Sequence, residues 1–112
     1  MTRLRGFNPN KRVPAPHHGE IWLAESLPFE DGIHSKSRPV VIKRREGDMF
    51  LCYKCTSQES TFRERYRVID LEEAGLTKYS YIDYDPIFIP REQLSYKLGS
   101  ISEEDRTNFG KL

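Results

Sequence analysis

The chain has 112 residues, which is enough for one modest hydrophobic core and too few for two. Charged residues make up 31% and hydrophobic residues 37% of the chain, a composition that favours a small barrel or sandwich over a thick multilayer fold. No apolar stretch approaches the ~20 residues that cross a bilayer, and no apolar signal segment precedes the body. We therefore expect a cytoplasmic protein without a membrane partner.

The net charge of +1 hides an uneven distribution of charge along the chain. Residues 1–67 carry 13 Lys and Arg against 8 Asp and Glu, whereas residues 68–112 carry 5 against 9. A basic half suits a polyanion such as nucleic acid, and an acidic half suits a basic partner. The alternative is that the charges only keep a small domain in solution.

The chain divides into a basic arm and one domain. Residues 1–18 contain three prolines and follow neither a helical nor a strand period, which predicts a flexible or extended arm. Residues 19–112 form the domain. Its first predicted strand spans residues 19–26, where Trp22 is expected to pack in the core rather than to stack on a ligand.

Two β-rich runs at residues 38–44 and 49–57 are separated by a charged turn that contains Gly47, which predicts a hairpin. If the turn is centred on Glu46 and Gly47, residue 45 faces residue 48 across the hairpin. The position numbers of any two facing residues then add up to about 93. Arg38 then faces residue 55, or Thr56 if one residue bulges. A guanidinium beside a hydroxyl suits a phosphate, because its planar fork can donate two hydrogen bonds to phosphate oxygens.

Other residues are placed to assist Arg38 and Thr56. Ser57 adds a second hydroxyl, and the loop at 27–37 ends beside Arg38 after presenting His34 and Lys36. A hydroxyl nucleophile would need a base, for which His34 is the candidate, but donation of a hydrogen bond to a phosphate oxygen is the simpler hypothesis.

Two further candidates lie elsewhere in the sequence. Glu20 is either a substrate-binding residue or a structural salt-bridge partner in the first strand. The segment 63–67 interleaves Arg65 and other charged residues with Tyr66, a pattern that resembles a surface for single-stranded RNA. Exposed strand faces also carry such arginines, so the pattern alone is weak.

The second half of the chain predicts more short elements. They are a fourth strand at 65–71, a turn or helical turn at 72–78, a strand at 79–90 with Pro86 at an edge or bulge, one helical turn at 90–94, and a helix that begins after Ser102. Five or six short strands with small helices favour a mainly β fold, a partly open barrel that the last helix covers.

The motifs of common cofactor sites are missing from the sequence. There is no Walker loop, dinucleotide glycine pattern, His-Glu-x-x-His motif or acidic magnesium cluster. Cys52 and Cys55 lie in a β-type run, where residues three apart face opposite ways, so we interpret them as structural thiols. We expect neither a cofactor nor a metal. Cleavage of RNA remains feasible, because the 2′-hydroxyl of the substrate is an internal nucleophile.

The chain resembles the MazF/PemK family of toxin endoribonucleases from Gly19 to about Phe109. The residues that carry this resemblance are Gly19-Glu20-Ile21-Trp22, Ser37-Arg38-Pro39-Val40-Val41-Ile42, Cys55-Thr56-Ser57, Ala74-Gly75-Leu76, Ser80 and Leu98-Gly99-Ser100-Ile101-Ser102. Each motif is short, but their order and spacing together are fairly specific. The loop at 27–37 departs from the family pattern, since it lacks the Gly-rich stretch common before the Arg-Pro pair, and the N-terminal arm is longer than usual.

The resemblance implies an SH3-like barrel, a homodimer, and a cognate antitoxin that binds near the loop before Arg38. It also implies sequence-selective, metal-independent cleavage of single-stranded mRNA, which leaves a 2′,3′-cyclic phosphate and a 5′-hydroxyl. Arg38 matches the catalytic arginine of the family, and Thr56 matches its catalytic threonine. Because a guanidinium scarcely deprotonates, we assign Arg38 mainly to charge stabilisation.

Two alternatives belong to other functional classes. A CcdB-like toxin would use the same barrel to bind DNA gyrase through the helix at 102–109, without catalysis. The second alternative is an RNA-binding barrel that does not cut its ligand. The pairing of Arg38 with Thr56 argues against the gyrase alternative, which has no need for a phosphate site.

Overall fold

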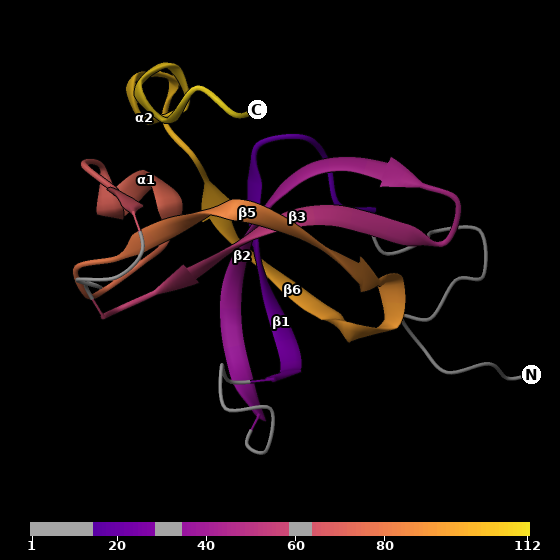
Figure 1. Cartoon of the computed structure of the whole chain (residues 1–112). Helices are drawn as coiled ribbons and strands as arrows, with labels where there is room; N and C mark the ends of the chain where they lie inside the picture. Colours follow the sequence, from indigo (N-terminus) through magenta and orange to yellow (C-terminus); the bar gives the residue numbers. More distant parts are fainter. Residues whose placement is uncertain (1–14, 29–34, 59–63) are drawn as a thin grey trace, which may run out of the picture.

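Six antiparallel strands form one curved sheet in the order β4-β5-β3-β2-β1-β6 (Figure 1). The computed structural model describes residues 15–28, 35–58 and 64–112. The strands are β1 (Glu20–Pro28), β2 (Ser35–Glu46), β3 (Met49–Thr56), β4 (Arg65–Arg67), β5 (Tyr81–Pro90) and β6 (Leu94–Ser100). Within the described residues β4 does not pair with β6, so the sheet is not closed into a barrel. The prediction of a mainly β fold is confirmed.

The β2–β3 hairpin is longer than predicted and has a different register at its tip. Glu46 pairs with Met49 across a two-residue turn, in which Gly47 has a φ of 63°. A positive φ at this position suits glycine, which has no Cβ to clash with the backbone. The register then shifts by one residue between Ile42 and Arg44, so a bulge separates the tip from the rest of the hairpin.

Strand β6 was not predicted from the sequence. Its middle residues, Ser95, Tyr96 and Lys97, are exposed, so they do not follow the alternation of a half-buried strand. The strand forms because it pairs with β1, where Leu23 lies opposite Tyr96 and Ala24 opposite Leu94. Because this pairing joins residues some 70 positions apart, the local sequence pattern does not predict the strand.

The sheet has a hydrophobic cluster on each face. One cluster contains Ile21, Val41, Tyr53, Cys55, Val68, Ala74, Ile82, Ile101 and Phe109. The other contains Trp22, Ala24, Leu27, Val40, Ile42, Phe50, Cys52, Ile89 and Leu94. The alternation of side chains along each strand explains this division, because neighbours such as Val40 and Val41 point to opposite faces. Trp22 is 3% exposed, which confirms its prediction as a packing residue.

Two of the sequence motifs meet where helix α1 (Leu71–Ala74) packs on β6. Gly75 ends α1 with a φ of 75°, and a Cβ at this position would lie 2.0 Å from the carbonyl oxygen of Leu98. A Cβ at Gly99 would lie 2.4 Å from the carbonyl oxygen of Glu73. Because the two backbones touch, neither position has room for a side chain.

Helix α2 (Glu103–Phe109) is anchored through one carboxylate. Ser102 caps the helix, and its Oγ accepts a hydrogen bond from the backbone N–H of Asp105. The fully buried Asp105 accepts hydrogen bonds from Tyr66 Oη and from the backbone N–H groups of Ile69 and Asp70. Phe109 packs edge-on against Tyr53, with 5.0 Å between the ring centroids. The helix is therefore joined to β4 and the segment after it by polar contacts, and to β3 by the contact between Phe109 and Tyr53.

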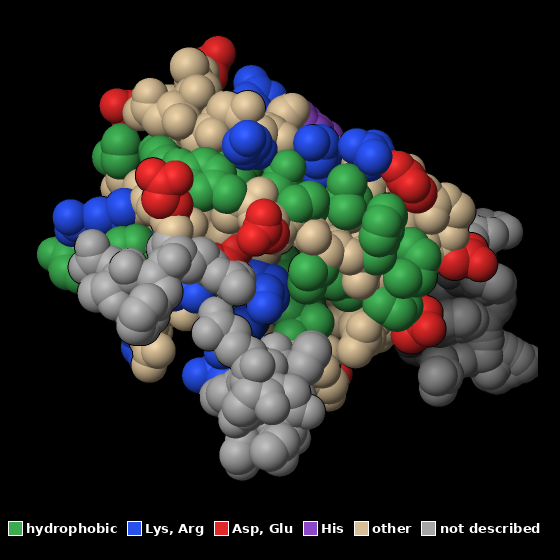
Figure 2. All heavy atoms as spheres, in the orientation of Figure 1, with side chains coloured by type: hydrophobic (Ala, Val, Ile, Leu, Met, Phe, Trp, Pro, Cys, Tyr) green, Lys and Arg blue, Asp and Glu red, His purple; other side chains and the backbone are tan. Residues whose placement is uncertain are grey.

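A strip of hydrophobic surface continues the Tyr53 face of the sheet beyond α2. Leu51 pairs with Phe88, and Tyr53 pairs with Pro86, so these side chains share one face of β3 and β5. Phe88 is 51% exposed. Figure 2 shows hydrophobic side chains gathered over this part of the molecule, with Lys and Arg above them.

No helix among the described residues is long and apolar enough to span a membrane.

Candidate functional site

Strands β2, β3 and β5 change from apolar to polar side chains along one face. The buried members of this face on these strands include Val40, Ile42, Cys52 and Ile89. By strand alternation, the following residues continue the same face at its other end, which we call the polar end: Lys36, Arg38, Lys54, Thr56, Tyr81, Asp83 and, on β4, Arg65 and Arg67. The sheet therefore joins a hydrophobic cluster to a charged surface without a change of strand.

The register directs the two predicted catalytic residues to the same face of the sheet. The pairing of β2 with β3 ends at Val40 and Lys54, and the same register continued by two residues on each strand would set Arg38 opposite Thr56. The sequence predicted this facing of Arg38 and Thr56 from a turn centred one residue earlier than the observed one, so the predicted register of the hairpin tip was wrong. Both side chains are half-buried, so a ligand at the surface can reach them.

The hydroxyl of Thr56 is held by the turn that follows β3. The backbone N–H of Gln58 donates a hydrogen bond to Thr56 Oγ1 over 3.2 Å. This bond occupies one acceptor position and leaves the hydroxyl proton available for a ligand. Ser57 lies between these residues and is exposed, so it is next to the site but its side chain extends from the bend rather than from the strand.

The polar end carries more positive than negative charge. Its cations are Lys36, Arg38, Lys54, Arg65 and Arg67, and the carboxylates that alternation places on the same face of β5 are Asp83 and Asp85. Arg65 Nε lies 2.6 Å from Asp83 Oδ1, so this carboxylate is already paired. Lys36 is exposed two residues before Arg38 on β2. The remaining excess of positive charge is suited to a polyanion.

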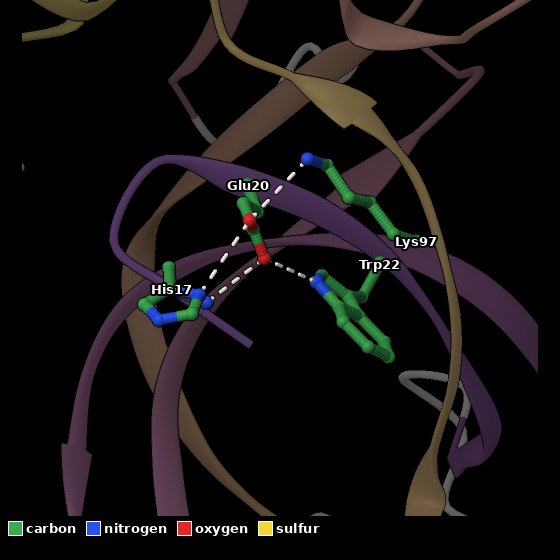
Figure 3. Close-up of polar contacts among 4 residues, drawn as sticks. All are labelled: His17, Glu20, Trp22 and Lys97. Carbon is green, nitrogen blue, oxygen red and sulfur yellow. Dashed lines mark hydrogen bonds and ion pairs between the residues drawn. The ribbon is translucent and has the colours of Figure 1, made fainter. Parts of the chain in front are cut away.

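Glu20 lies away from the polar end. It is four residues along β1 from Ala24, which pairs with Arg38, a separation of about 13 Å at the rise of a β-strand. Its carboxylate accepts hydrogen bonds from Trp22 Nε1 and from the backbone N–H of His17, both at 2.9 Å (Figure 3). The structure therefore does not bring Glu20 together with Arg38 and Thr56.

The contacts of Glu20 are those of a structural salt bridge. Lys97 Nζ on β6 lies 3.3 Å from the carboxylate, so Glu20 joins the first strand to the last (Figure 3). Burial of the carboxylate opposes its charged form, but the hydrogen bonds from Trp22 and His17 and the charge of Lys97 outweigh burial and lower the pKa of Glu20. The contacts support the structural alternative that the sequence left open.

The predicted stacking residue of the 63–67 segment is not on the expected surface. Tyr66 donates a hydrogen bond to Asp105 and packs against Phe109, so its ring lies on the face opposite Arg38. Tyr79 instead presents an exposed ring, 64% accessible, with the guanidinium of Arg67 4.8 Å from its centroid. No local sequence pattern indicates that Tyr79 rather than Tyr66 is exposed, because this depends on the pairing of β4 with β5.

Three predictions concern residues that the structure does not describe. His34 lies outside the described residues, as does most of the arm at 1–18 and the start of the basic segment at 63–67. Lys54, Asp83 and Tyr79 were not among the predicted site residues. Lys54 could have been found from its alternation with Thr56 along β3, whereas the other two depend on register.

The two cysteines have the environment of structural thiols. Cys52 belongs to the cluster that contains Trp22, and Cys55 belongs to the cluster on the opposite face. Burial raises the pKa of both thiols to about 12, and the nearby charge of Asp83 adds to the shift at Cys55. Both are therefore protonated at neutral pH and unreactive as nucleophiles.

Among residues 15–28, 35–58 and 64–112, no group of three or more His, Cys, Asp or Glu side chains could hold a metal ion. No protein-family model matches the chain, and no curated protein matches its sequence significantly. The functional interpretation therefore depends on the geometry of the polar end.

Proposed function

We propose that this protein is a metal-independent endoribonuclease that cuts single-stranded mRNA, without needing the ribosome, by attack of the substrate's own 2′-hydroxyl. The observation that carries this proposal is the β2–β3 register, which beyond its last pair, Val40 with Lys54, directs Arg38 and Thr56 to the same basic end of the sheet face. A cation and a hydroxyl that converge from neighbouring strands can both bind the oxygens of one phosphate.

The proposed reaction needs little from the protein beyond positioning and charge stabilisation. The 2′-oxygen forms a bond to phosphorus, the bond to the 5′-oxygen breaks, the 2′-hydroxyl loses its proton and the leaving oxygen gains one. Arg38 stabilises the negative charge that builds up on the phosphate oxygens, and Thr56 Oγ1 donates a hydrogen bond to one of them. The products carry a 2′,3′-cyclic phosphate and a 5′-hydroxyl.

The rest of the polar end is suited to holding the RNA strand. Lys36 and Lys54 extend the positive surface on either side of Arg38, and Ser57 adds a second hydroxyl beside Thr56. The exposed ring of Tyr79 offers a platform on which an unpaired base can stack. Cations that follow the backbone and an aromatic that stacks on a base together bind single strands with little demand for sequence.

The resemblance to MazF/PemK toxins supports a proposal for the fold family, the cellular location and the protein partners of this chain. We place the open antiparallel sheet with its small helices among SH3-like, partly open barrels with a C-terminal helix. The protein acts in the cytoplasm as a homodimeric toxin. A cognate antitoxin blocks it by covering the polar end, where an acidic segment of the antitoxin competes with RNA for the same cations.

The test is an assay of purified protein with a mixed-sequence single-stranded RNA in excess chelator, followed by mapping of the RNA ends. We expect cuts that leave cyclic phosphate and 5′-hydroxyl termini. Arg38→Ala should lower the rate roughly a hundredfold or more, which is the typical loss when one oxyanion-stabilising group is removed.

Arg45→Ala is the matched control, since Arg45 is an exposed arginine on the same strand, near the hairpin tip. It should cut RNA at the wild-type rate. Near-wild-type cleavage by Arg38→Ala would reject the role of Arg38. Intact RNA with the wild-type protein would reject the proposed activity, and a gel shift of that intact RNA would identify a binding protein instead. Sedimentation of the purified protein tests the dimer separately.

A further inference from the structure

A buried ion pair lies beside the proposed site, on the strand next to Thr56. Arg65 pairs with Asp83 in the β4–β5 register, and their side chains are only 11% and 4% exposed. Thr56 pairs with Tyr81, two residues before Asp83 on β5. Removing two charges from water is costly, so a buried pair contributes little net stability unless its geometry is good and further hydrogen bonds satisfy both groups.

Hydrogen bonds connect this ion pair to the Thr56 hydroxyl. Arg65 Nε donates to Asp83 Oδ1 at 2.6 Å, and Arg65 Nη1 donates to the carbonyl oxygen of Gln58 at 2.9 Å. The N–H of Gln58 in turn donates to Thr56 Oγ1 at 3.2 Å. Asp83 thus fixes the plane of the guanidinium, and the guanidinium holds the residue that bonds the hydroxyl.

The guanidinium is suited to this task because its donors form a rigid fork. Nε and Nη1 bond two acceptors from different segments at the same time, which a single ammonium cannot reproduce. A threonine hydroxyl can rotate between staggered positions about χ1. A bond from Gln58 to Oγ1 selects one of these positions, and that position fixes where the hydroxyl lies relative to Arg38.

We propose that Arg65 and Asp83 are positioning residues that set the rotamer of Thr56 through Gln58. The sequence predicted that Arg65 binds substrate directly, whereas its hydrogen bonds direct the guanidinium to Asp83 and Gln58. The effect on catalysis rests on the proposed endoribonuclease activity, but the effect on the Thr56 rotamer does not. The two can therefore be tested apart.

A purely structural pair would behave differently from a positioning pair. If Arg65 and Asp83 only hold the three-residue strand β4 against β5, their loss lowers the stability of the protein and leaves the folded molecules fully active. If they position Thr56, folded molecules cleave more slowly while binding RNA as before. The division between kcat and KM, measured well below the unfolding temperature, separates these cases.

The experiment compares Arg65→Lys and Asp83→Asn with the wild type, and uses Arg45→Lys as a matched control. For each protein, three-bond couplings measured by NMR give the χ1 populations of Thr56, and cleavage of a single-stranded RNA gives kcat and KM. We expect mixed rotamers at Thr56 and a fall of about tenfold in kcat for Arg65→Lys, the effect of one lost charge-assisted hydrogen bond, with KM within about twofold of the wild type. Asp83→Asn should show the same changes to a smaller degree, since its amide oxygen still accepts one bond from Arg65. Arg45→Lys should change neither quantity.

A single Thr56 rotamer retained in both variants would overturn the inference, whatever the activity. A loss confined to stability, with kcat unchanged, would also overturn it. If the wild-type protein does not cut RNA, the proposed function fails, while the NMR couplings still decide whether Arg65 and Asp83 position Thr56.

Discussion

The two ends of the face formed by β2, β3 and β5 differ in what packs against them. At one end, Trp22 from β1 and Leu94 at the start of β6 complete a cluster with Val40 and Ile42. At the other end, the same strands carry cations and hydroxyls that are half-buried or exposed, Arg38 among them. One end of the face is therefore buried in a core, whereas the other is accessible to a ligand, so we expect mutations at the two ends to affect stability and the proposed activity separately.

The largest expected effect is at the apolar end. Ile42→Ala removes a buried side chain, only 1% exposed, from the cluster that contains Trp22. The lost contacts and the cavity should lower the free energy of unfolding by about 2–5 kcal/mol, measured by urea denaturation. The rate of RNA cleavage per folded molecule should not change. A fall in kcat without loss of stability would break the separation of the two ends.

The next effect concerns the anchor of α2, on the face opposite the polar end. Burial opposes the charge of Asp105, but hydrogen bonds from Tyr66, Asp70, Ile69 and Ser102 outweigh it and lower the pKa of Asp105. A lowered pKa in the folded state contributes stability that is present above the unfolded pKa and is lost as the pH falls through the folded pKa. We therefore expect the wild type to lose stability as the solution becomes acidic.

Asp105→Asn tests this expectation. At neutral pH it should lower the free energy of unfolding by about 1–3 kcal/mol, because the buried donors keep only one good acceptor. The difference from the wild type should shrink as the pH falls. A constant difference between neutral and acidic pH would show that the charge of Asp105 is unimportant.

At the polar end, Thr56→Val keeps the shape of the side chain and removes its hydroxyl. We expect kcat for RNA cleavage to fall roughly tenfold or more, since one hydrogen bond to the charged phosphate is lost. The free energy of unfolding should stay within about 0.5 kcal/mol of the wild type, as is usual for substitutions outside the core. Thermal denaturation and single-turnover kinetics on the same sample provide both values.

The smallest effect is expected for Lys54→Ala. Lys54 is the member of the polar end that lies nearest the apolar end, opposite Val40. Loss of one phosphate contact should weaken RNA binding by a few-fold and reduce the slope of log affinity against log salt concentration by about one. Fluorescence anisotropy with a labelled RNA at several salt concentrations measures both. An unchanged slope would remove Lys54 from the proposed binding surface.

Local sequence patterns determined much of the fold and part of the site. Alternation of apolar residues, together with glycine and proline at turns, predicted five of the six strands. The hairpin arithmetic directed Arg38 and Thr56 to the same face of the sheet, although it placed the turn one residue too early. These features depend on neighbours within about 20 residues along the chain. The uneven charge along the chain predicted a basic first half, and all the cations of the polar end come from that half.

Tertiary structure alone decided the remainder. Strand β6, the pairing of Arg65 with Asp83 and the exchange of Tyr66 for Tyr79 all depend on contacts between distant segments. Whether a strand residue faces the core or the solvent depends on its register with a partner, and a shift of one residue reverses every side chain. The sequence by itself determined which residues could carry chemistry, and the packing of the sheet decided which of them face the same place.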